Sequence, residues 1–283
     1  MNKKLGFGDQ LAQAMGERGP LCVGIDPHPE LLKQWRLEDS ASGLASFSET
    51  VIEAVDSRVA ALKPQVALFE RLGSAGFKVL EEVLAECRRR QILVIADAKR
   101  GDIGSTMSAY AQAWLGREST LSTDSVTLSP YLGFESLRPA LDIAQEEQRG
   151  VFVLALTSNP EGKTVQHMGG RSSVALQMFK SARDENERVG FTQMGSCGLV
   201  IGATVGDALQ ELKIDLTGFN GPILAPGYGA QGATAESLFE TFRGIENQIL
   251  VNSSRDILRH GNCVQGLIDA IELTNSDLMK VIE

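Results

Sequence analysis

Four charged residues stand close together where an apolar segment of the chain ends. The stretch VIADAKRGDIGST, residues 94–106, starts with aliphatic residues and then carries Asp97, Lys99, Arg100 and Asp102. On an extended strand, Asp97 and Lys99 point to the same side, about 7 Å apart along the backbone. A solvated salt bridge is the usual explanation for one such pair. Several charges grouped with two glycines at a strand end favour a functional site instead.

Carboxylates on both sides of Lys99 define the chemistry that this group could perform. Opposite charge stabilises the protonated form of an amine, so we expect Lys99 to be a cation and general acid, not a base or a Schiff-base amine. A fixed ammonium can stabilise a carbanion and then protonate it. A nearby carboxylate can repel a negative group on the substrate. Both effects favour the loss of CO2 and the capture of the carbanion that remains.

Eight short apolar runs are the elements that must position these charges. They lie at residues 21–26, 59–64, 92–99, 124–130, 151–158, 198–204, 222–227 and 248–255. The runs are almost continuously apolar, which is typical of parallel strands covered on both faces. Amphipathic stretches typical of helices separate them, as at residues 76–90 and 135–148. Eight strand–helix units predict an α/β fold: a closed (β/α)8 TIM barrel, with a doubly wound open sheet as the alternative.

We expect residues 1–283 to form a single domain, because no linker, low-complexity tract or repeat divides the chain. A short amphipathic helix precedes the first strand. A longer loop–helix excursion, at about residues 157–197, separates the fifth strand from the sixth. Its first part is a glycine-rich loop, either a lid or a surface excursion, and a helix follows at around residues 174–188.

Polar residues follow nearly every predicted strand. In a TIM barrel, the carboxyl ends of the strands build the active site. The residues at these ends are Asp26, Lys63, Asp97, Lys99, Ser129, Asn159, Thr204, Tyr228 and Arg255. The loops after the seventh and eighth strands of such barrels often bind phosphate. The glycine-rich segment 226–232, with Gln231 and with Arg255 after the last strand, therefore predicts a phosphate site.

The composition limits the classes of partner. The formal net charge is −9, which argues against a nucleic-acid-binding surface. No apolar run approaches the roughly 18–20 residues of a membrane span, and the amino-terminal segment lacks the apolar core of a signal peptide. The four cysteines are far apart and lack the spacing of a zinc site. These features predict a soluble cytoplasmic protein with reduced thiols and with no nucleic-acid or membrane partner.

The segment DAKRGDIGST resembles the signature of the orotidine 5′-phosphate decarboxylase family, D-x-K-x-x-D-I-x-x-T. The stretches GIDPHP, LKP, LSPYLG, TSNPEG, PGYGAQG and NSSR extend the resemblance over essentially the whole chain. The chain length and the last two stretches are similar to the longer bacterial branch of the family. The resemblance implies decarboxylation of orotidine 5′-phosphate to uridine 5′-phosphate and CO2, the last step of de novo pyrimidine synthesis, with no metal or organic cofactor.

The resemblance also implies roles for individual residues. Lys99 would protonate C6 of the pyrimidine, and Asp97 would lie near the departing carboxylate. Asp102 would reach the site of a partner subunit across a homodimer interface. The other implied substrate contacts are Asp26 and Lys63 at the ribose, Thr106 beside Asp102, Ser129 at the pyrimidine edge, Asn159 in the long loop, and Gln231, Arg255, Gly229 and Tyr228 at the phosphate.

Two other functions are compatible with parts of this pattern. A magnesium-dependent decarboxylase or aldolase acting on a sugar phosphate shares the D-x-K-x-x-D spacing, and metal dependence would distinguish it. The continuation RGDIGST and the stretch SPY favour the pyrimidine enzyme. The second alternative is a non-catalytic nucleotide-binding protein, in which Asp97 and Asp102 would weaken the affinity for an anionic ligand.

Overall fold

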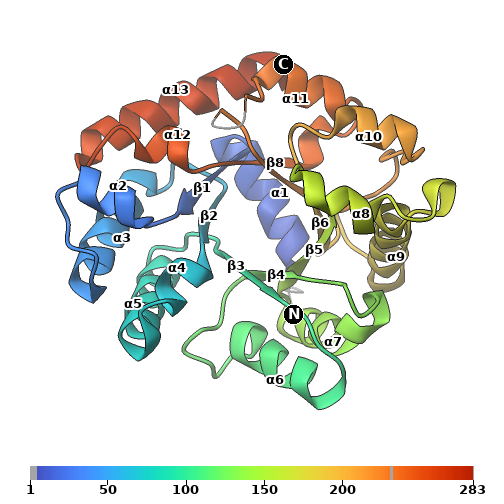
Figure 1. Cartoon of the computed structure of the whole chain (residues 1–283), viewed down its shortest axis with the longest axis horizontal. Helices are drawn as coiled ribbons and strands as arrows, with labels where there is room; N and C mark the ends of the chain where they lie inside the picture. The colour runs from blue at the N-terminus through green and yellow to red at the C-terminus, as the bar shows by residue number, and fades with distance from the viewer. Residues whose placement is uncertain (1–4, 230–231, 283) are drawn as a thin grey trace.

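Eight parallel strands close into one barrel in the computed structural model, which describes residues 5–229 and 232–282 (Figure 1). The order around the sheet is β2-β1-β8-β7-β6-β5-β4-β3. The strands are β1 (Leu21–Ile25), β2 (Ala61–Pro64), β3 (Ile95–Arg100), β4 (Ser125–Leu128), β5 (Gly150–Leu156), β6 (Cys197–Ile201), β7 (Ile223–Pro226) and β8 (Ile249–Ser253). Each strand falls on one of the eight predicted apolar runs, because strands buried on both faces carry an apolar side chain at nearly every position.

The barrel closes between β2 and β3, the two ends of that order. Single bridges pair Leu62 with Val94 and Gln65 with Asp97, both in the parallel sense. The Leu62 N–H donates to the Leu93 carbonyl at 2.8 Å. The prediction of a closed, single-domain TIM barrel is therefore confirmed, and the open-sheet alternative is wrong.

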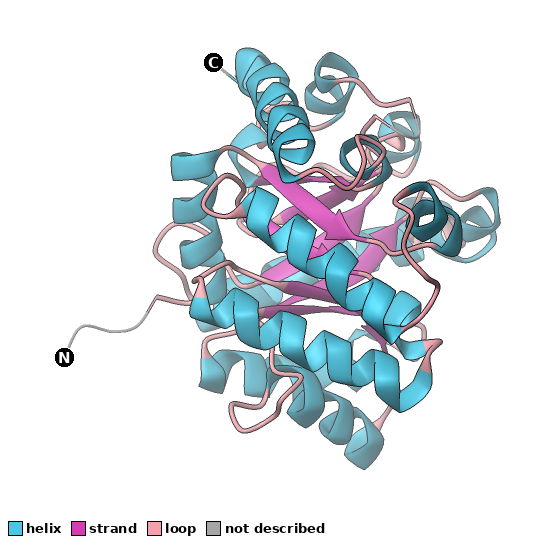
Figure 2. Ribbon diagram, turned by 90° about the vertical axis from the view of Figure 1, so that its left-hand side faces the viewer, coloured by secondary structure: helices cyan, strands magenta, loops and turns pink. Residues whose placement is uncertain are grey.

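Helices surround the strands on the outside of the barrel (Figure 2). They are α1 (Phe7–Arg18), α2 (Pro29–Gln34), α3 (Ala41–Val55), α4 (Val66–Glu70), α5 (Gly73–Arg89), α6 (Gly104–Leu115), α7 (Arg138–Glu147), α8 (Lys163–Gln166), α9 (Val174–Val189), α10 (Gly206–Glu211), α11 (Ala235–Thr241), α12 (Arg255–Leu258) and α13 (Val264–Ile282). In α5, Val79, Leu80, Val83, Leu84 and Cys87 are buried. This spacing of three and four residues gives the helix one apolar face for the sheet.

The helix α1 fills the amino-terminal end of the barrel, and it lies across the middle of the ring in Figure 1. Its residues Phe7, Leu11 and Met15 are buried in one cluster with strand residues such as Phe152 and Leu250. The rings of Phe7 and Phe152 meet edge to face, with centroids 6.0 Å apart. Because this end is filled by side chains, the carboxyl end of the strands is left for a substrate.

The excursion between β5 and β6 carries three short helical turns before α9. They are the 3-10 helices η2 (Pro160–Gly162) and η3 (Gly170–Ser172), with α8 between them. The Ser173 side chain accepts a hydrogen bond from Leu176 N and caps α9. No helix within residues 5–229 and 232–282 is long and apolar enough to cross a membrane.

Candidate active site

The Asp97 carboxylate is the centre of a polar cluster at the carboxyl ends of β2, β3 and β4. Its Oδ2 atom accepts hydrogen bonds from Lys63 Nζ at 2.9 Å and Gln65 Nε2 at 3.2 Å. Its Oδ1 atom accepts from Lys99 Nζ at 2.5 Å and Thr127 Oγ1 at 2.9 Å. Both carboxylate oxygens are therefore held from two sides, and one anion joins two ammonium groups.

The electrostatics of this cluster keep its buried members ionised. Burial by itself raises the pKa of Asp97, but Lys63 and Lys99 outweigh it and hold the pKa well below its ordinary value. Burial likewise lowers the pKa of Lys63, but the Asp97 and Asp26 carboxylates hold that pKa above its usual range. The exposed fraction of the side chain is 4% for Lys63 and 46% for Lys99. Lys99 is therefore the cation that faces the open end of the barrel.

The backbone at Lys99 departs from the regular strand that the two-residue spacing predicts. Along β3 and β4, Ala96 pairs with Val126 and Arg100 pairs with Leu128, so β3 has two extra residues in a bulge. Lys99 lies in the left-handed region, with φ of 47°. This conformation costs a non-glycine residue free energy, so surrounding contacts must hold it. The bulge, and not simple strand alternation, brings the Lys99 ammonium onto Asp97.

Asp102 lies outside this cluster within the chain. Its Oδ1 atom accepts a hydrogen bond from Ile103 N at 2.8 Å. Among the described residues, no hydrogen bond or ion pair joins Asp102 to Lys99 or Asp97, and the third charge of the cluster is Lys63. Thr106 is exposed on the first turn of α6. The positions of Asp102 and Thr106 are compatible with the predicted role at a partner subunit. Contacts within one chain do not test that role.

The ends of β1 and β4 also reach this edge of the barrel. Asp26 Oδ1 is buried and has no hydrogen-bond partner among the described residues, so this carboxylate oxygen can accept from a ligand hydroxyl. Ser129 donates its backbone N–H to the Arg100 carbonyl at 2.8 Å. A Cβ atom on Gly101 would lie 2.2 Å from the Ser129 carbonyl oxygen, so only glycine fits there. The loops after β3 and β4 are therefore packed together.

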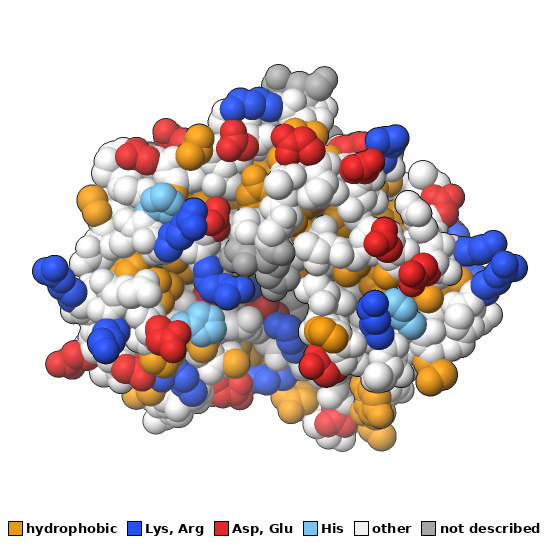
Figure 3. Space-filling view, turned by 45° about the horizontal axis from the view of Figure 1, so that its top comes forward, with side chains coloured by type: hydrophobic (Ala, Val, Ile, Leu, Met, Phe, Trp, Pro, Cys, Tyr) orange, Lys and Arg blue, Asp and Glu red, His pale blue; other side chains and the backbone are white. Residues whose placement is uncertain are grey.

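Arg255, one of the residues predicted to bind phosphate, lines a hollow that also borders Asp26. This cavity has a volume of about 640 Å³ and is also lined by His28, by Glu30, Leu31 and Gln34 on α2, and by Asp256 and Arg259 in and just after α12. Arg255 is exposed, and its guanidinium forms no ion pair with any residue that the structure describes. Figure 3 shows Lys and Arg side chains beside a hollow near the middle of this face. An unpaired guanidinium in a concave site is suited to a phosphate.

The loop after β7 contributes Tyr228 and Gly229. Gly229 has φ of 69°, and a Cβ atom there would lie 2.8 Å from Asp256 Oδ2, so the position requires glycine. Tyr228 is half-buried and pairs with Ala233 in a single bridge. Burial raises the pKa of the Tyr228 hydroxyl, which therefore stays protonated and can donate to an anion. Gln231 lies outside the described residues.

Two of the remaining strand-end residues have neighbours of their own. Asn159 Oδ1 accepts from Thr157 Oγ1 at 2.6 Å, and Asn159 Nδ2 donates to Glu161 at 3.1 Å. These bonds hold the loop after β5 and occupy the amide. Thr204 lines a different groove, between α10 and α11. Neither residue contacts the Asp97 cluster in the described part of the chain.

Sequence reasoning missed two members of the cluster, Gln65 and Thr127. Gln65 directly follows the stretch LKP at the end of β2. The other candidate site residues were also predicted from their positions at the ends of strands. Thr127 is a polar residue inside the apolar run of β4, and it is almost completely buried. A hydroxyl buried in such a strand needs a hydrogen-bond partner, and this requirement could have indicated that Thr127 belongs to the polar cluster.

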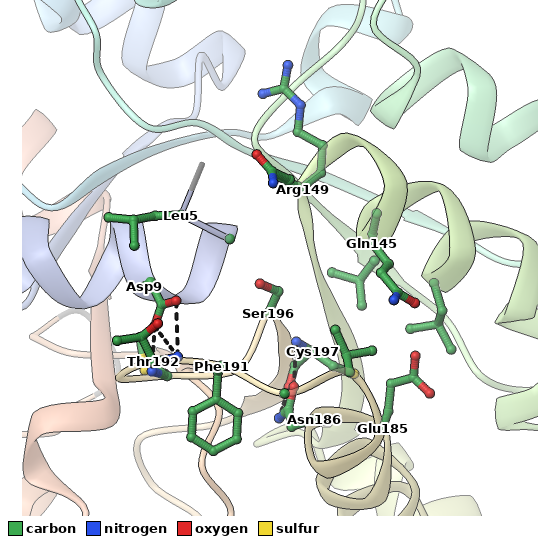
Figure 4. A pocket seen from close by; sticks show the side chains of 18 residues that line it. Leu5, Asp9, Gln145, Arg149, Glu185, Asn186, Phe191, Thr192, Ser196 and Cys197 are labelled. Carbon is green, nitrogen blue, oxygen red and sulfur yellow. Dashed lines mark hydrogen bonds between the residues drawn. The ribbon is translucent and has the colours of Figure 1, made fainter. Parts of the chain in front are cut away.

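Another cavity, of about 460 Å³, lies at the opposite end of the barrel (Figure 4). Asp9 on α1 borders it and accepts hydrogen bonds from the backbone N–H groups of Thr192, Gln193 and Met194. Glu185, also at its wall, is paired with Arg138 and Arg188. Both carboxylates of this cavity's described lining, Asp9 and Glu185, are therefore already held by structural contacts.

Comparison with known proteins identifies the family of this chain. The model of the orotidine 5′-phosphate decarboxylase / HUMPS family matches residues 19–267. The orotidine 5′-phosphate decarboxylase of Streptomyces coelicolor is 52% identical over 268 residues, which are 94% of each chain. That of Salinispora arenicola is 49% identical over 96% of each chain.

Solved structures show the same likeness. A Streptomyces avermitilis protein assigned as an orotidine 5′-phosphate decarboxylase superimposes with a TM-score of 0.93 and 49% identity, covering 98% of this chain and 96% of its own. The Leishmania donovani OMP decarboxylase gives a TM-score of 0.76 with 28% identity, over 97% and 100% of the two chains. The family model and these relatives show that the chain belongs to the orotidine 5′-phosphate decarboxylase / HUMPS family.

Proposed function

We propose that the Asp97–Lys99 pair performs the decarboxylation of orotidine 5′-phosphate to uridine 5′-phosphate and CO2, a step of pyrimidine biosynthesis. The curated relatives at about half identity, all named for this activity, support the reaction over the sugar-phosphate alternative. The observation that carries the residue roles is the anion held between two ammonium groups at the open end of the barrel.

The proposed chemistry has one bond broken and one formed at the same carbon. The bond between C6 of the pyrimidine and its carboxylate breaks, CO2 leaves, and the electron pair stays on C6. The Lys99 ammonium stabilises this carbanion and then transfers a proton from Nζ to C6. Lys99 regains a proton from water, since its side chain is half-exposed at the barrel mouth.

The four hydrogen bonds to Asp97 give this carboxylate a defined role. They hold it in place and ionised, so it cannot turn away from a carboxylate that is brought next to it. Like charges placed together in a site of low dielectric repel strongly. Loss of CO2 removes one of the two charges. The carboxylate of Asp97 therefore favours the state after decarboxylation over the bound substrate.

The substrate contacts follow from the positions around the cluster. Asp26 and Lys63 would bind the ribose hydroxyls, and Ser129 would contact the pyrimidine edge. Phosphate binding far from the breaking bond can fix the pyrimidine against Lys99. The residues proposed for the phosphate are Gln231, Arg255, Gly229 and Tyr228, and Asn159 would contact the substrate from the loop after β5.

We further propose a homodimer that shares its sites. Ile103, Tyr131 and Leu132 follow β3 and β4 and are 62%, 80% and 54% exposed. Contacts of Arg100 and Gly101 with Ser129 pack the two loops together, which supports one shared apolar surface for these side chains beside the site. A second copy would bury this surface. Asp102 directly precedes Ile103 and Thr106 follows it by three residues, so both would then face the partner's site.

The reaction is tested by the loss of orotate absorbance when the purified protein is mixed with orotidine 5′-phosphate and a metal chelator. We expect rapid loss with formation of uridine 5′-phosphate. Loss that requires added magnesium would support the metal-dependent alternative. Lys99→Ala should abolish turnover and keep the fold, as judged by circular dichroism. Turnover close to that of the unmodified protein would refute the proton-donor role.

A further inference from the structure

We infer that Thr127, on β4, is the residue that holds the Lys99 bulge in its productive shape. The inference rests on the proposed role of Lys99 as proton donor. Thr127 Oγ1 accepts a hydrogen bond from Lys99 N at 2.9 Å. The same hydroxyl donates to Asp97 Oδ1 at 2.9 Å. One buried hydroxyl therefore links the backbone of the proton donor to the carboxylate beside it.

The direction of these bonds is fixed by the chemistry of the hydroxyl. A threonine side chain has one proton to donate, and an ionised carboxylate can only accept. That proton therefore goes to Asp97, and a lone pair of the oxygen is left for the Lys99 N–H. The Asp97 Oδ1 atom in turn accepts from Lys99 Nζ. The two ends of Lys99, its backbone nitrogen and its ammonium, are thus tied to the same pair of side chains.

The strained backbone explains why such a link is needed. Lys99 has a left-handed φ within a bulge, a conformation that persists only where neighbours impose it. Beyond Lys99, the Arg100 carbonyl accepts from Ser129 N, which fixes the chain after the bulge. Before it, the Lys99 N–H would have no strand partner in the disrupted ladder, and Thr127 supplies one. Thr127 itself is 1% exposed and sits in regular strand, so it is a rigid support.

The expected consequence is a defect in the chemical step and not in substrate binding. Without the hydroxyl, Lys99 relaxes away from the geometry that protonates C6, while the ribose and phosphate contacts remain. Thr127→Val keeps the shape of the side chain and removes the hydroxyl. We expect kcat to fall about 10- to 100-fold, the size of a lost hydrogen bond to a charged group, with KM changed by less than about threefold.

Two further variants separate the hydroxyl from the packing. Thr127→Ser keeps the hydroxyl and should retain kcat within about threefold. Ser125→Ala is the matched control, since it removes another buried hydroxyl of β4 that has no hydrogen-bond partner among the described residues. We expect Ser125→Ala to leave kcat and KM unchanged. If the valine variant does not fold, Thr127→Cys is measured in its place, because a thiol of similar size is only a weak donor.

Steady-state kinetics with orotidine 5′-phosphate test the role of the Thr127 hydroxyl, and the melting temperature of each variant is measured alongside. A kcat of Thr127→Val or Thr127→Cys within about threefold of the unmodified protein overturns the inference. So does an equal loss in Thr127→Ser, or a KM that rises as much as kcat falls. Lys99→Ala tests the underlying role separately: if it stays active, the proton-donor proposal fails, and if it is inactive while Thr127→Val is normal, only the present inference fails.

Discussion

Replacing Lys63 by methionine tests how far the cluster depends on its buried cation. Lys63 Nζ lies 2.9 Å from Asp97 Oδ2, and the exposed fractions of the two side chains are 4% and 9%. Methionine fills a similar volume without charge. The substitution therefore leaves the buried Asp97 carboxylate with Lys99 as its one ammonium partner among the described residues.

The structure sets the size of the expected effect. Removing one partner of a buried ion pair costs about 3–5 kcal/mol of folding free energy, because the other charge is left uncompensated. Asp97 keeps three of its four contacts, those from Gln65, Lys99 and Thr127. We therefore expect the lower end, about 3 kcal/mol, which corresponds to a fall in melting temperature of roughly 6–12 °C for a chain of this size.

The assay compares denaturant unfolding and turnover of Lys63→Met with those of Lys78→Met. Lys78 is an exposed lysine on α5, so its loss should change the unfolding free energy by less than about 0.5 kcal/mol. We also expect kcat to fall in Lys63→Met, since the pKa of Asp97 rises when the main cation beside it is removed.

A double variant measures the interaction between Lys63 and Asp97 directly. Lys63→Met combined with Asp97→Asn removes both charges of the pair, so its unfolding free energy should fall by less than the sum of the two single changes. Additive effects would show that the two side chains act independently. A Lys63→Met variant as stable as Lys78→Met would refute the reasoning, because Asp97 would then not need its buried partner.

Three further predictions concern the phosphate, the dimer and the response to acid. Arg255→Ala should lower kcat/KM about 10- to 100-fold by removing a charge-assisted contact to the phosphate. Arg243→Ala, on the outer surface, is the control and should leave kcat/KM unchanged. Equal kcat/KM values in the two variants would show that Arg255 does not bind the phosphate. Ile103→Asp should place a charge in the proposed dimer surface, so we expect a monomer by light scattering with low activity, and an active monomer would contradict shared sites. The pKa of Asp97 is lowered in the folded state, so its stabilising contribution is present above the ordinary carboxyl pKa of about 4 and is lost as the pH falls further. The difference in unfolding free energy between the unmodified protein and Asp97→Asn should therefore be constant from about pH 5 to 7 and shrink below about pH 4, and a difference that does not change with pH would exclude this linkage.

Local sequence patterns determined the parts of this protein that depend on one element at a time. The eight apolar runs predicted the eight strands, since burial on both faces requires an apolar side chain at nearly every strand position. Helices such as α5 followed from the spacing of their apolar residues. The polar residues at the strand ends predicted the location of the site, and the DAKRGDIGST segment indicated the family.

Only the tertiary structure decided which of these residues meet. Lys63 and Asp97 are separated by 34 residues, and their contact depends on the closure of the barrel between β2 and β3. Thr127 contacts Lys99 through a bulge and a left-handed backbone that no periodic pattern contains. Asp102 is close to Asp97 in the sequence but does not contact it in the described part of one chain, whereas the distant Lys63 does. The physical reason is that spacing fixes the direction of a side chain along its own strand, whereas register, closure and bulges fix which strands place their side chains together.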